Sequence, residues 1–334
     1  TNRSCPYSKS ILERAFEGGY NFIAALLGQE CCTTMNRMEQ YFEYCDLIPK
    51  DKFFVACIDM PINRSEWHVG YYRRQMEKKI LEPLRETYGV DFSEERLRAA
   101  IAEHNELCRI ITEMGELRKA ENPVITGYEF HVMQLASLTC PKYLILPLLR
   151  ETLEELKTRE PEPKPWFRAR VMVTGAEIDD PEFTKMLEMC GAMVVADRYC
   201  FGSMPGREPI EILEGETALD AIARHYLYNN HCPRAMGPEN LRARKLYVYN
   251  KAKEYGAEGV IIESMKFCEY WGYERAQDSA WLTEGFAVPG TLPVCQIERD
   301  YTCAASGQLR TRFQAFVESL EIKRIQAAEQ KEGA

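Results

Sequence analysis

The sequence predicts an α/β protein of two doubly wound domains, flavodoxin- or Rossmann-like, with a helical insertion in the first. In the second half, short β-branched runs alternate with helical stretches, as in a parallel sheet covered by helices. In the first half, two apolar runs and several long helical stretches resemble half of such a domain. Between the halves, Glu160–Pro165 has three alternating prolines, which exclude a helix and an interior strand. We therefore expect domains at 1–160 and 166–326, joined by a linker at 161–165.

Apolar periodicity places the elements of the first half. The expected strands cover 22–27 and 53–58, and the expected helices cover 7–17, 67–88, 93–119 and 143–157. The pair Asn122-Pro123 ends the second of the two long helical patterns. Because several long helices follow only two strands, we expect the extra helices to form an insertion.

The second half has the stronger strand pattern. The expected strands are 170–174, 192–195, 259–262 and 292–297, and the expected helices begin at 180 and cover 217–227, 239–255, 275–285 and 307–326. Ligands of doubly wound sheets bind at the carboxyl ends of the strands. The segments that follow strands here are Gly175–Glu177, Asp197–Gly202, Cys268 and Asp300–Cys303, and we expect them to line one rim.

Composition excludes several classes of protein. The net charge of −9 and pI near 5.4 argue against a nucleic-acid-binding protein, which needs clustered Lys and Arg. No apolar run approaches the roughly 20 residues of a membrane helix. The polar start at Thr1–Ser10 is unlike a signal peptide, so we expect a cytoplasmic protein that binds no membrane.

The 13 cysteines are a high count for a chain of this length. Without a secretory signal they are expected as reduced thiols and metal ligands rather than as disulfides. Cys5, Cys32 and Cys268 each fall at a strand end or in a loop that opens a helix, where thiolates can converge on an iron–sulfur cluster. Three thiolates would leave one iron without a protein ligand. Apolar neighbours predict a core position for five others, namely Cys57, Cys108, Cys140, Cys190 and Cys295.

Several motifs in order carry a resemblance to one family. They are the loops of Cys5 and Cys32, Asp197-Arg-Tyr-Cys-Phe-Gly-Ser203, Lys266-Phe-Cys268 and Gly307–Phe316. Together they resemble the family that contains (R)-2-hydroxyacyl-CoA dehydratase component D and ATP-dependent benzoyl-CoA reductase, over nearly the whole chain. The short region before Cys5 suggests the smaller cluster-bearing subunit. That family usually has several tens of residues ahead of the first ligand, where only four stand here, so the subunit is either short or longer than this sequence.

The resemblance implies radical chemistry on a thioester. It assigns a [4Fe-4S] cluster to Cys5, Cys32 and Cys268, a larger homologous cluster-bearing subunit as partner, and a separate ATP-hydrolysing iron–sulfur activator. The activator delivers one low-potential electron, and the dimer passes it to an acyl-CoA to form a ketyl-type radical. The chain itself should not bind ATP, and it lacks a Gly-x-x-x-x-Gly-Lys-Ser/Thr loop.

The resemblance covers two reactions. Dehydratase small subunits tend to follow the third ligand with an acidic, proline-containing run, whereas here Cys268 is followed by Glu-Tyr-Trp-Gly-Tyr-Glu274. This favours a benzoyl-CoA reductase, which reduces an aromatic ring, over the alternative of an (R)-2-hydroxyacyl-CoA dehydratase, which eliminates water. Two further alternatives are a non-catalytic relay subunit and a double-cubane protein. The double cubane would add ligands from among Cys31, Cys200, Cys232 and Cys303.

Other polar residues are candidates for substrate and cofactor contacts. His131 is a candidate proton donor for ring reduction. Asp197 and Tyr199 follow a strand and could face the CoA or the cluster as catalytic residues. Gln308 and Arg312 open the last helix, whose amides suit an anion, so they are candidates for cofactor binding. The structural alternatives are core packing for His131 and ion pairs for the charged residues.

Overall fold

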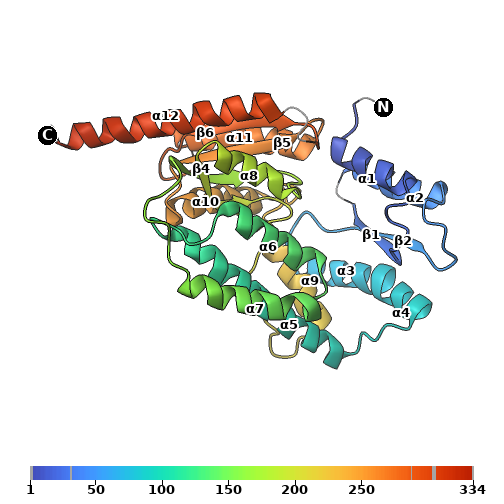
Figure 1. Ribbon diagram of the computed structural model, residues 1–334. Coiled ribbons are helices and arrows are strands. Elements are labelled where there is room, and N and C mark those ends of the chain that lie inside the picture. Colours follow the sequence, from blue (N-terminus) through green and yellow to red (C-terminus); the bar gives the residue numbers. More distant parts are fainter. Residues whose placement is uncertain (1–2, 31, 287, 303–305, 333–334) are drawn as a thin grey trace.

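The computed structural model describes residues 3–30, 32–286, 288–302 and 306–332. It confirms a mixed α/β protein with parallel sheets (Figure 1). A two-stranded sheet pairs β1 (Ala25–Gln29) with β2 (Phe54–Ile58). The main sheet has the order β4-β3-β5-β6, formed by β3 (Ala169–Thr174), β4 (Ala192–Arg198), β5 (Gly259–Met265) and β6 (Val294–Arg299).

The main sheet is covered on both faces, which is why its strands are apolar runs. Successive side chains of a strand point to opposite faces. Val171 and Val173 therefore pack with α8 (Pro181–Met189) and α12 (Ser306–Glu332). Met172 between them packs with α10 (Pro238–Glu254) and α11 (Glu269–Glu284) on the other face. All four predicted strands are confirmed, and β5 extends three residues beyond its expected end (265 − 262).

The small sheet is flanked by α1 (Pro6–Phe16) and α2 (Thr33–Tyr44). After β2 the predicted helix at 67–88 is present, but a π-helical turn at Glu77–Leu81 divides it into α3 (Glu66–Met76) and α4 (Glu82–Tyr88). In Figure 1 this N-terminal part lies beside one end of the main sheet. The strand β1 begins three residues later than predicted (25 − 22), and Phe22 is 80% exposed.

Three helices form a separate apolar cluster before the linker. They are α5 (Glu94–Glu116), α6 (Gly127–Thr139) and α7 (Lys142–Thr158). Helix α6 was not expected from the sequence, and it begins with a capping box between Thr126 and Glu129. This helix packs on α8 and β4 of the main sheet. The proposed domain boundary at 161–165, where the chain is neither helix nor strand, stays a prediction.

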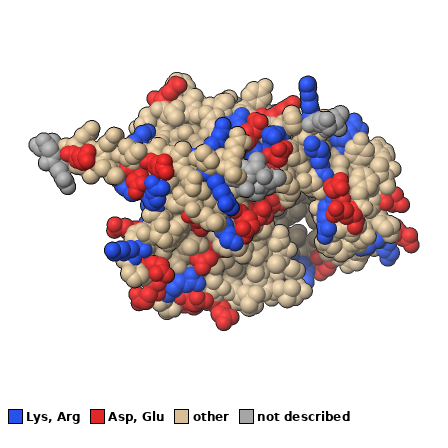
Figure 2. All heavy atoms as spheres, turned by 45° about the horizontal axis from the view of Figure 1, so that its top comes forward, with Lys and Arg blue, Asp and Glu red and all other residues tan. Residues whose placement is uncertain are grey.

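The remaining helix, α9 (Ala218–Tyr228), follows β4 in the chain. It contacts α3 and α5, two helices of the first half. Basic and acidic side chains are interspersed on the face in Figure 2, as is usual for a solvated surface. Among the described residues, no helix combines the length and the apolar character that crossing a membrane requires.

Candidate functional site

A cavity of about 190 Å³ lies at the carboxyl ends of the main-sheet strands. One side is formed by the starts of α1 and α2, and the other by the turns after β3, β4 and β5. Five thiols line it, those of Cys5, Cys32, Cys200, Cys232 and Cys268. The structure therefore brings together the three predicted cluster cysteines from positions up to 263 residues apart (268 − 5).

The three predicted ligands share one structural position. Cys5, Cys32 and Cys268 are the N-cap residues of α1, α2 and α11. The N-terminus of a helix presents unpaired amide groups and a positive dipole end, both of which favour thiolates and anionic groups. Before Cys268, Phe267 has a φ of 62°, and this left-handed residue turns the chain from β5 into α11. Three helix N-termini thus converge on the cavity.

Cys200 and Cys232 come from two other segments. Cys200 follows β4, and Cys232 lies between α9 and α10. Both are expected as ligands only under the double-cubane alternative. The other two cysteines of that alternative, Cys31 and Cys303, lie outside the described residues.

One buried arginine joins the segments that carry these thiols. The Arg198 guanidinium lies 2.7 Å from Glu274 of α11 and 3.3 Å from Asp278. It also donates a 2.9 Å hydrogen bond to the carbonyl of His231, the neighbour of Cys232. Arg198 is 0% exposed, so these charges are paired without solvent. This residue is therefore a structural ion-pair centre between the Cys200 turn, the Cys232 loop and α11.

Burial favours the protonated form of four of the cavity thiols in the absence of metal. It raises the pKa of Cys268 to about 12 and also raises the pKa values of Cys5, Cys200 and Cys232. The nearby Glu177 carboxyl adds to the shift. Ligation to iron removes the proton, so metal binding at these thiols releases protons.

The donor set fits an iron–sulfur cluster. Cys5, Cys200, Cys232 and Cys268 are thiols outside any disulfide. In the part of the chain that the structure describes, no three His, Cys, Asp or Glu side chains share a single-ion site. A tetrahedral ion with metal–sulfur bonds of about 2.3 Å holds its sulfurs roughly 3.8 Å apart, whereas a four-iron cluster is larger and separates them further. Soft thiolates around an open cavity are what such a cluster requires.

Glu177 lines the cavity but is not among the site residues predicted from the sequence. It lies in the predicted rim segment after β3, and its carboxylate accepts a hydrogen bond from Cys200 Sγ at 3.9 Å. Burial raises the pKa of Glu177 to about 7, and the Glu263 carboxyl adds to this. A carboxyl group at this point was predictable, but not its orientation toward the thiols.

His131 lies in the core between α6 and α8. It is 0% exposed, with Nδ1 2.9 Å from Thr184 Oγ1 and Nε2 3.1 Å from the Ile178 carbonyl. Burial lowers the pKa of His131. Its side chain lines neither the cysteine cavity nor the pocket of Asp197. The proton-donor role stays a prediction, with a geometry typical of a structural histidine.

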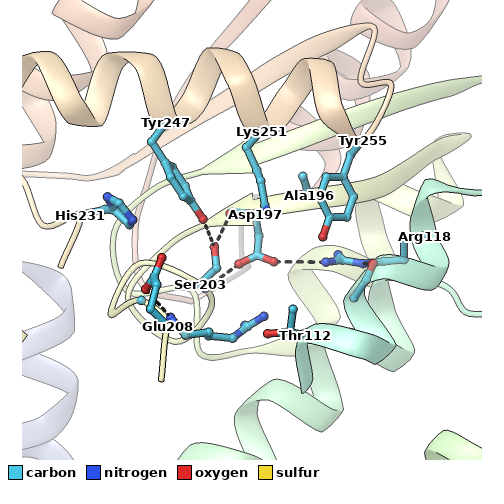
Figure 3. Close-up of a pocket in the computed structure, with 13 residues that line it drawn as sticks. Thr112, Arg118, Ala196, Asp197, Ser203, Glu208, His231, Tyr247, Lys251 and Tyr255 are labelled. Carbon is cyan, nitrogen blue, oxygen red and sulfur yellow. Dashed lines mark hydrogen bonds and ion pairs between the residues drawn. The ribbon is translucent and has the colours of Figure 1, made fainter. Parts of the chain in front are cut away.

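Asp197 lies in a second pocket of about 290 Å³ (Figure 3). Its carboxylate accepts a 2.7 Å hydrogen bond from the Ser203 amide and lies 3.6 Å from the Arg118 guanidinium. These groups, with Arg207, hold the pKa of Asp197 below its usual range despite burial. Tyr199 is 2% exposed and donates a 3.3 Å hydrogen bond to Gln134. Neither Asp197 nor Tyr199 therefore lines the cavity that contains the five thiols. Their catalytic roles stay predictions.

Gln308 and Arg312 are exposed on the first turns of α12. The intervening Leu309 and the following Phe313 face the core. Neither polar side chain lines the cysteine cavity or the pocket of Asp197. Their assignment to an anionic cofactor also stays a prediction.

Comparison with known proteins identifies the family. The family described as "2-hydroxyglutaryl-CoA dehydratase, D-component" matches residues 1–320. The chain belongs to this family. It is 26% identical to the (R)-phenyllactyl-CoA dehydratase beta subunit of Clostridium sporogenes, covering 95% of this chain and 80% of that protein. It is 24% identical to the lactoyl-CoA dehydratase subunit beta of Anaerotignum propionicum, with the same coverage.

A benzoyl-CoA reductase subunit is also similar. One of the subunits of the benzoyl-CoA reductase of Thauera aromatica is 20% identical, covering 79% of this chain and 67% of that protein. The predicted resemblance is therefore confirmed. The chain is an enzyme subunit of the family that contains acyl-CoA dehydratases and benzoyl-CoA reductase.

Proposed function

We propose that this chain holds an iron–sulfur cluster through Cys5, Cys32 and Cys268 and transfers electrons to an acyl-CoA. The observation that carries the proposal is the convergence of these three N-cap cysteines on one cavity. When bound, the cluster would supply one electron at low potential to the thioester. The three thiolates would hold it at helix N-termini, where the amides and dipoles stabilise its negative charge.

Apolar residues around the thiols reduce the contact of this site with water. Tyr7, Met35 and Trp271 line the cavity with apolar surface. Arg198, just before the Cys200 turn, forms a buried ion pair with Glu274 of α11. This ion pair holds the turn and the helix together in the cavity wall. An apolar, fixed environment limits side reactions of a reactive electron donor.

Two reactions are proposed for the site. Elimination of water from an (R)-2-hydroxyacyl-CoA has the support of the two dehydratase beta subunits, which match 95% of the chain. Reduction of an aromatic acyl-CoA has the support of the Glu269–Glu274 sequence and of the reductase relative, which matches 79%. We propose to test the dehydratase first, because its relatives match more of the chain at higher identity.

A partner subunit is part of the proposal. The dehydratase relatives are named beta subunits, which supports a larger homologous subunit beside this one. Phe267 lines the cavity and is 51% exposed, so it supplies apolar surface that a partner could cover. An ATP-hydrolysing iron–sulfur activator would deliver the electron, and it would dock transiently.

The double-cubane protein is the second candidate, and a specific observation favours it. Cys200 and Cys232 line the same cavity as the three predicted ligands. Five thiols exceed what one cubane with an open iron uses. In that case the chain would act on a different, small substrate.

Counting iron and sulfide after anaerobic reconstitution tests both candidates. The first predicts roughly four irons and four sulfides per chain, and the double cubane predicts roughly eight irons. Co-expression with a cluster-bearing partner and an activator, followed by assays with 2-hydroxyacyl-CoA and benzoyl-CoA esters, then separates dehydration from ring reduction. A chain that binds no iron under any of these conditions would overturn both candidates.

A further inference from the structure

We propose that a cavity between helix α2 and the small sheet binds a short aliphatic diamine in its doubly protonated form. The cavity has a volume of about 270 Å³ and shares no lining residue with the cavity of the five thiols. Helix α2 supplies one wall, and the end of β1 together with β2 supplies the other. The site does not depend on the proposed cluster, because none of the three predicted cluster ligands lines it.

One face of α2 is directed at this cavity. The side chains that line it have the spacing of a single helical face, and they are those of Asn36, Glu39, Gln40, Glu43 and Tyr44. Glu30, which follows β1, and Val55 and Cys57 of β2 complete the lining. Among these described residues, three carry carboxyl groups and none is basic. The charge of the lining therefore predicts a cationic ligand.

The Glu39 carboxylate is the buried part of this lining. Glu39 is 4% exposed, and its carboxylate accepts hydrogen bonds from the Gln29 amide and the Cys57 thiol. Its Oε2 atom is buried without a hydrogen-bond partner among the described residues, and so is Oδ1 of Asn36, three residues earlier on α2. Burial raises the pKa of Glu39, as expected for a carboxyl group without a cation. Two unpaired acceptors on one helical turn suit a ligand with several N–H donors.

The charges of the three carboxylates are not balanced within the described part of the chain. Glu30, Glu39 and Glu43 take part in none of the ion pairs that its residues form. Lys79 donates from Nζ to the Cys57 carbonyl at 3.0 Å instead, and it does not line the cavity. Glu39 and Glu43 lie four residues apart on α2, so their like charges repel each other. A cation bound between the carboxylates would remove this repulsion.

Gly28 in β1 allows the Glu39 side chain to lie against the small sheet. A Cβ atom at this position would overlap the Glu39 carboxyl group, so a larger residue would displace it. The carboxylate is thus held in place by the strand rather than by a cation. Such a preorganised acceptor needs little ordering when a ligand binds.

A diammonium cation matches this arrangement better than a metal ion does. In the described ranges of the chain, no three His, Cys, Asp or Glu side chains are placed to hold one metal ion. One ammonium group has three donors, which suit Glu39 Oε2 and Asn36 Oδ1. The exposed carboxylates of Glu30 and Glu43 suit the second ammonium group, and the Tyr44 ring adds a face for a cation. The cavity is smaller than the roughly 300–1,000 Å³ of drug-sized ligand sites, so the alkyl chain is short.

Isothermal titration calorimetry of the full chain with putrescine, a four-carbon diamine, tests this site. We expect one bound molecule per chain. Glu39→Gln removes the charge but keeps the shape, so it should weaken binding by at least about tenfold, as expected for the loss of one charged hydrogen bond. The matched control is Glu13→Gln, because Glu13 is exposed on α1 outside the cavity, and it should bind putrescine as the wild type does. Glu43→Gln, at an exposed position, should also weaken binding, and it replaces Glu39→Gln in the test if circular dichroism shows that variant to be unfolded.

Three results would overturn the assignment. The first is a wild type that does not bind putrescine, or a folded Glu39→Gln variant that binds it equally well. The second is equal affinity for butylamine, which would show that a single ammonium group, such as a lysine side chain of a partner protein, is what the cavity recognises. The third is displacement of putrescine by a lower concentration of Mg²⁺, which would assign the cavity to a metal ion. Iron plays no part in this titration, so its outcome is separate from that of the proposed function.

Discussion

Replacing Arg198 with methionine removes the guanidinium that joins three segments of the cysteine cavity. The variant loses ion pairs to Glu274 and Asp278, and the carboxylates stay buried because their surroundings are packed. Removing one partner of a buried ion pair costs about 3–5 kcal/mol. Arg244 remains 3.0 Å from Glu274, so one carboxylate keeps a cation. We therefore expect the lower end, about 3 kcal/mol of unfolding free energy.

Urea unfolding of the metal-free protein, followed by circular dichroism, measures this loss. The control is Arg168→Met, which breaks an ion pair with Glu321 at 2.6 Å whose side chains are 42% and 32% exposed. An exposed pair contributes at most about 1 kcal/mol, so the control should unfold near the wild type. If Arg198→Met were as stable as Arg168→Met, Arg198 would not be the structural ion-pair centre of the cavity.

Three further predictions concern the surroundings of the site. His131→Phe should lower the unfolding free energy by about 1–3 kcal/mol, because Thr184 and the Ile178 carbonyl lose their partner; a thermal melt with unchanged stability would contradict the core geometry. Gly175→Ala should cost about 1–3 kcal/mol in urea unfolding, since its Cβ would press on Glu263; normal stability would contradict this close contact. Burial raises the pKa of Glu188 to about 7, above its unfolded value, so the folded state binds the extra proton and unfolding free energy should fall as pH rises from about 4.5 to 7. Glu188→Gln should make that slope shallower, and an unchanged slope from urea unfolding at several pH values would exclude the assignment.

The strands of the main sheet could be predicted because burial of both faces leaves a direct mark on the sequence. Runs such as Val171–Val173 and Val260–Ile262 consist of consecutive apolar residues. A surface helix instead alternates apolar and polar residues, so the two patterns can be distinguished. The start of α6 was missed although Thr126 and Glu129 form a capping-box pattern, because the preceding Pro123 indicates a helix end more strongly than a new start. The predicted start of β1 was too early because the apolar residue Phe22 was counted as part of the strand. In the structure Phe22 is exposed and precedes the strand.

The sequence predicted that three thiols come together, but it did not predict the other groups that line their cavity. The positions of Cys5, Cys32 and Cys268 followed from loops that open helices and from the resemblance to the family. Cys200 lies in one of the motifs that carry the resemblance, but whether its thiol faces a cavity or the core depends on the turn after β4. The position of Glu177 in the cavity wall depends on contacts with residues distant in the sequence, such as Cys200, and these leave no local pattern.

Cys268 is proposed to hold a cluster together with Cys5 and Cys32. Its thiol is not expected to be required for folding. Iron content of the anaerobically reconstituted Cys268→Ala variant tests this role, measured together with circular dichroism. The control is Cys140→Ala, because Cys140 is exposed outside the cavity and not in the core, where its apolar neighbours had placed it. We expect Cys268→Ala to lose most of its iron while its circular dichroism spectrum matches that of Cys140→Ala, because the sheet core rests on apolar burial. A full iron content in Cys268→Ala would show that its thiolate is not a ligand of the cluster.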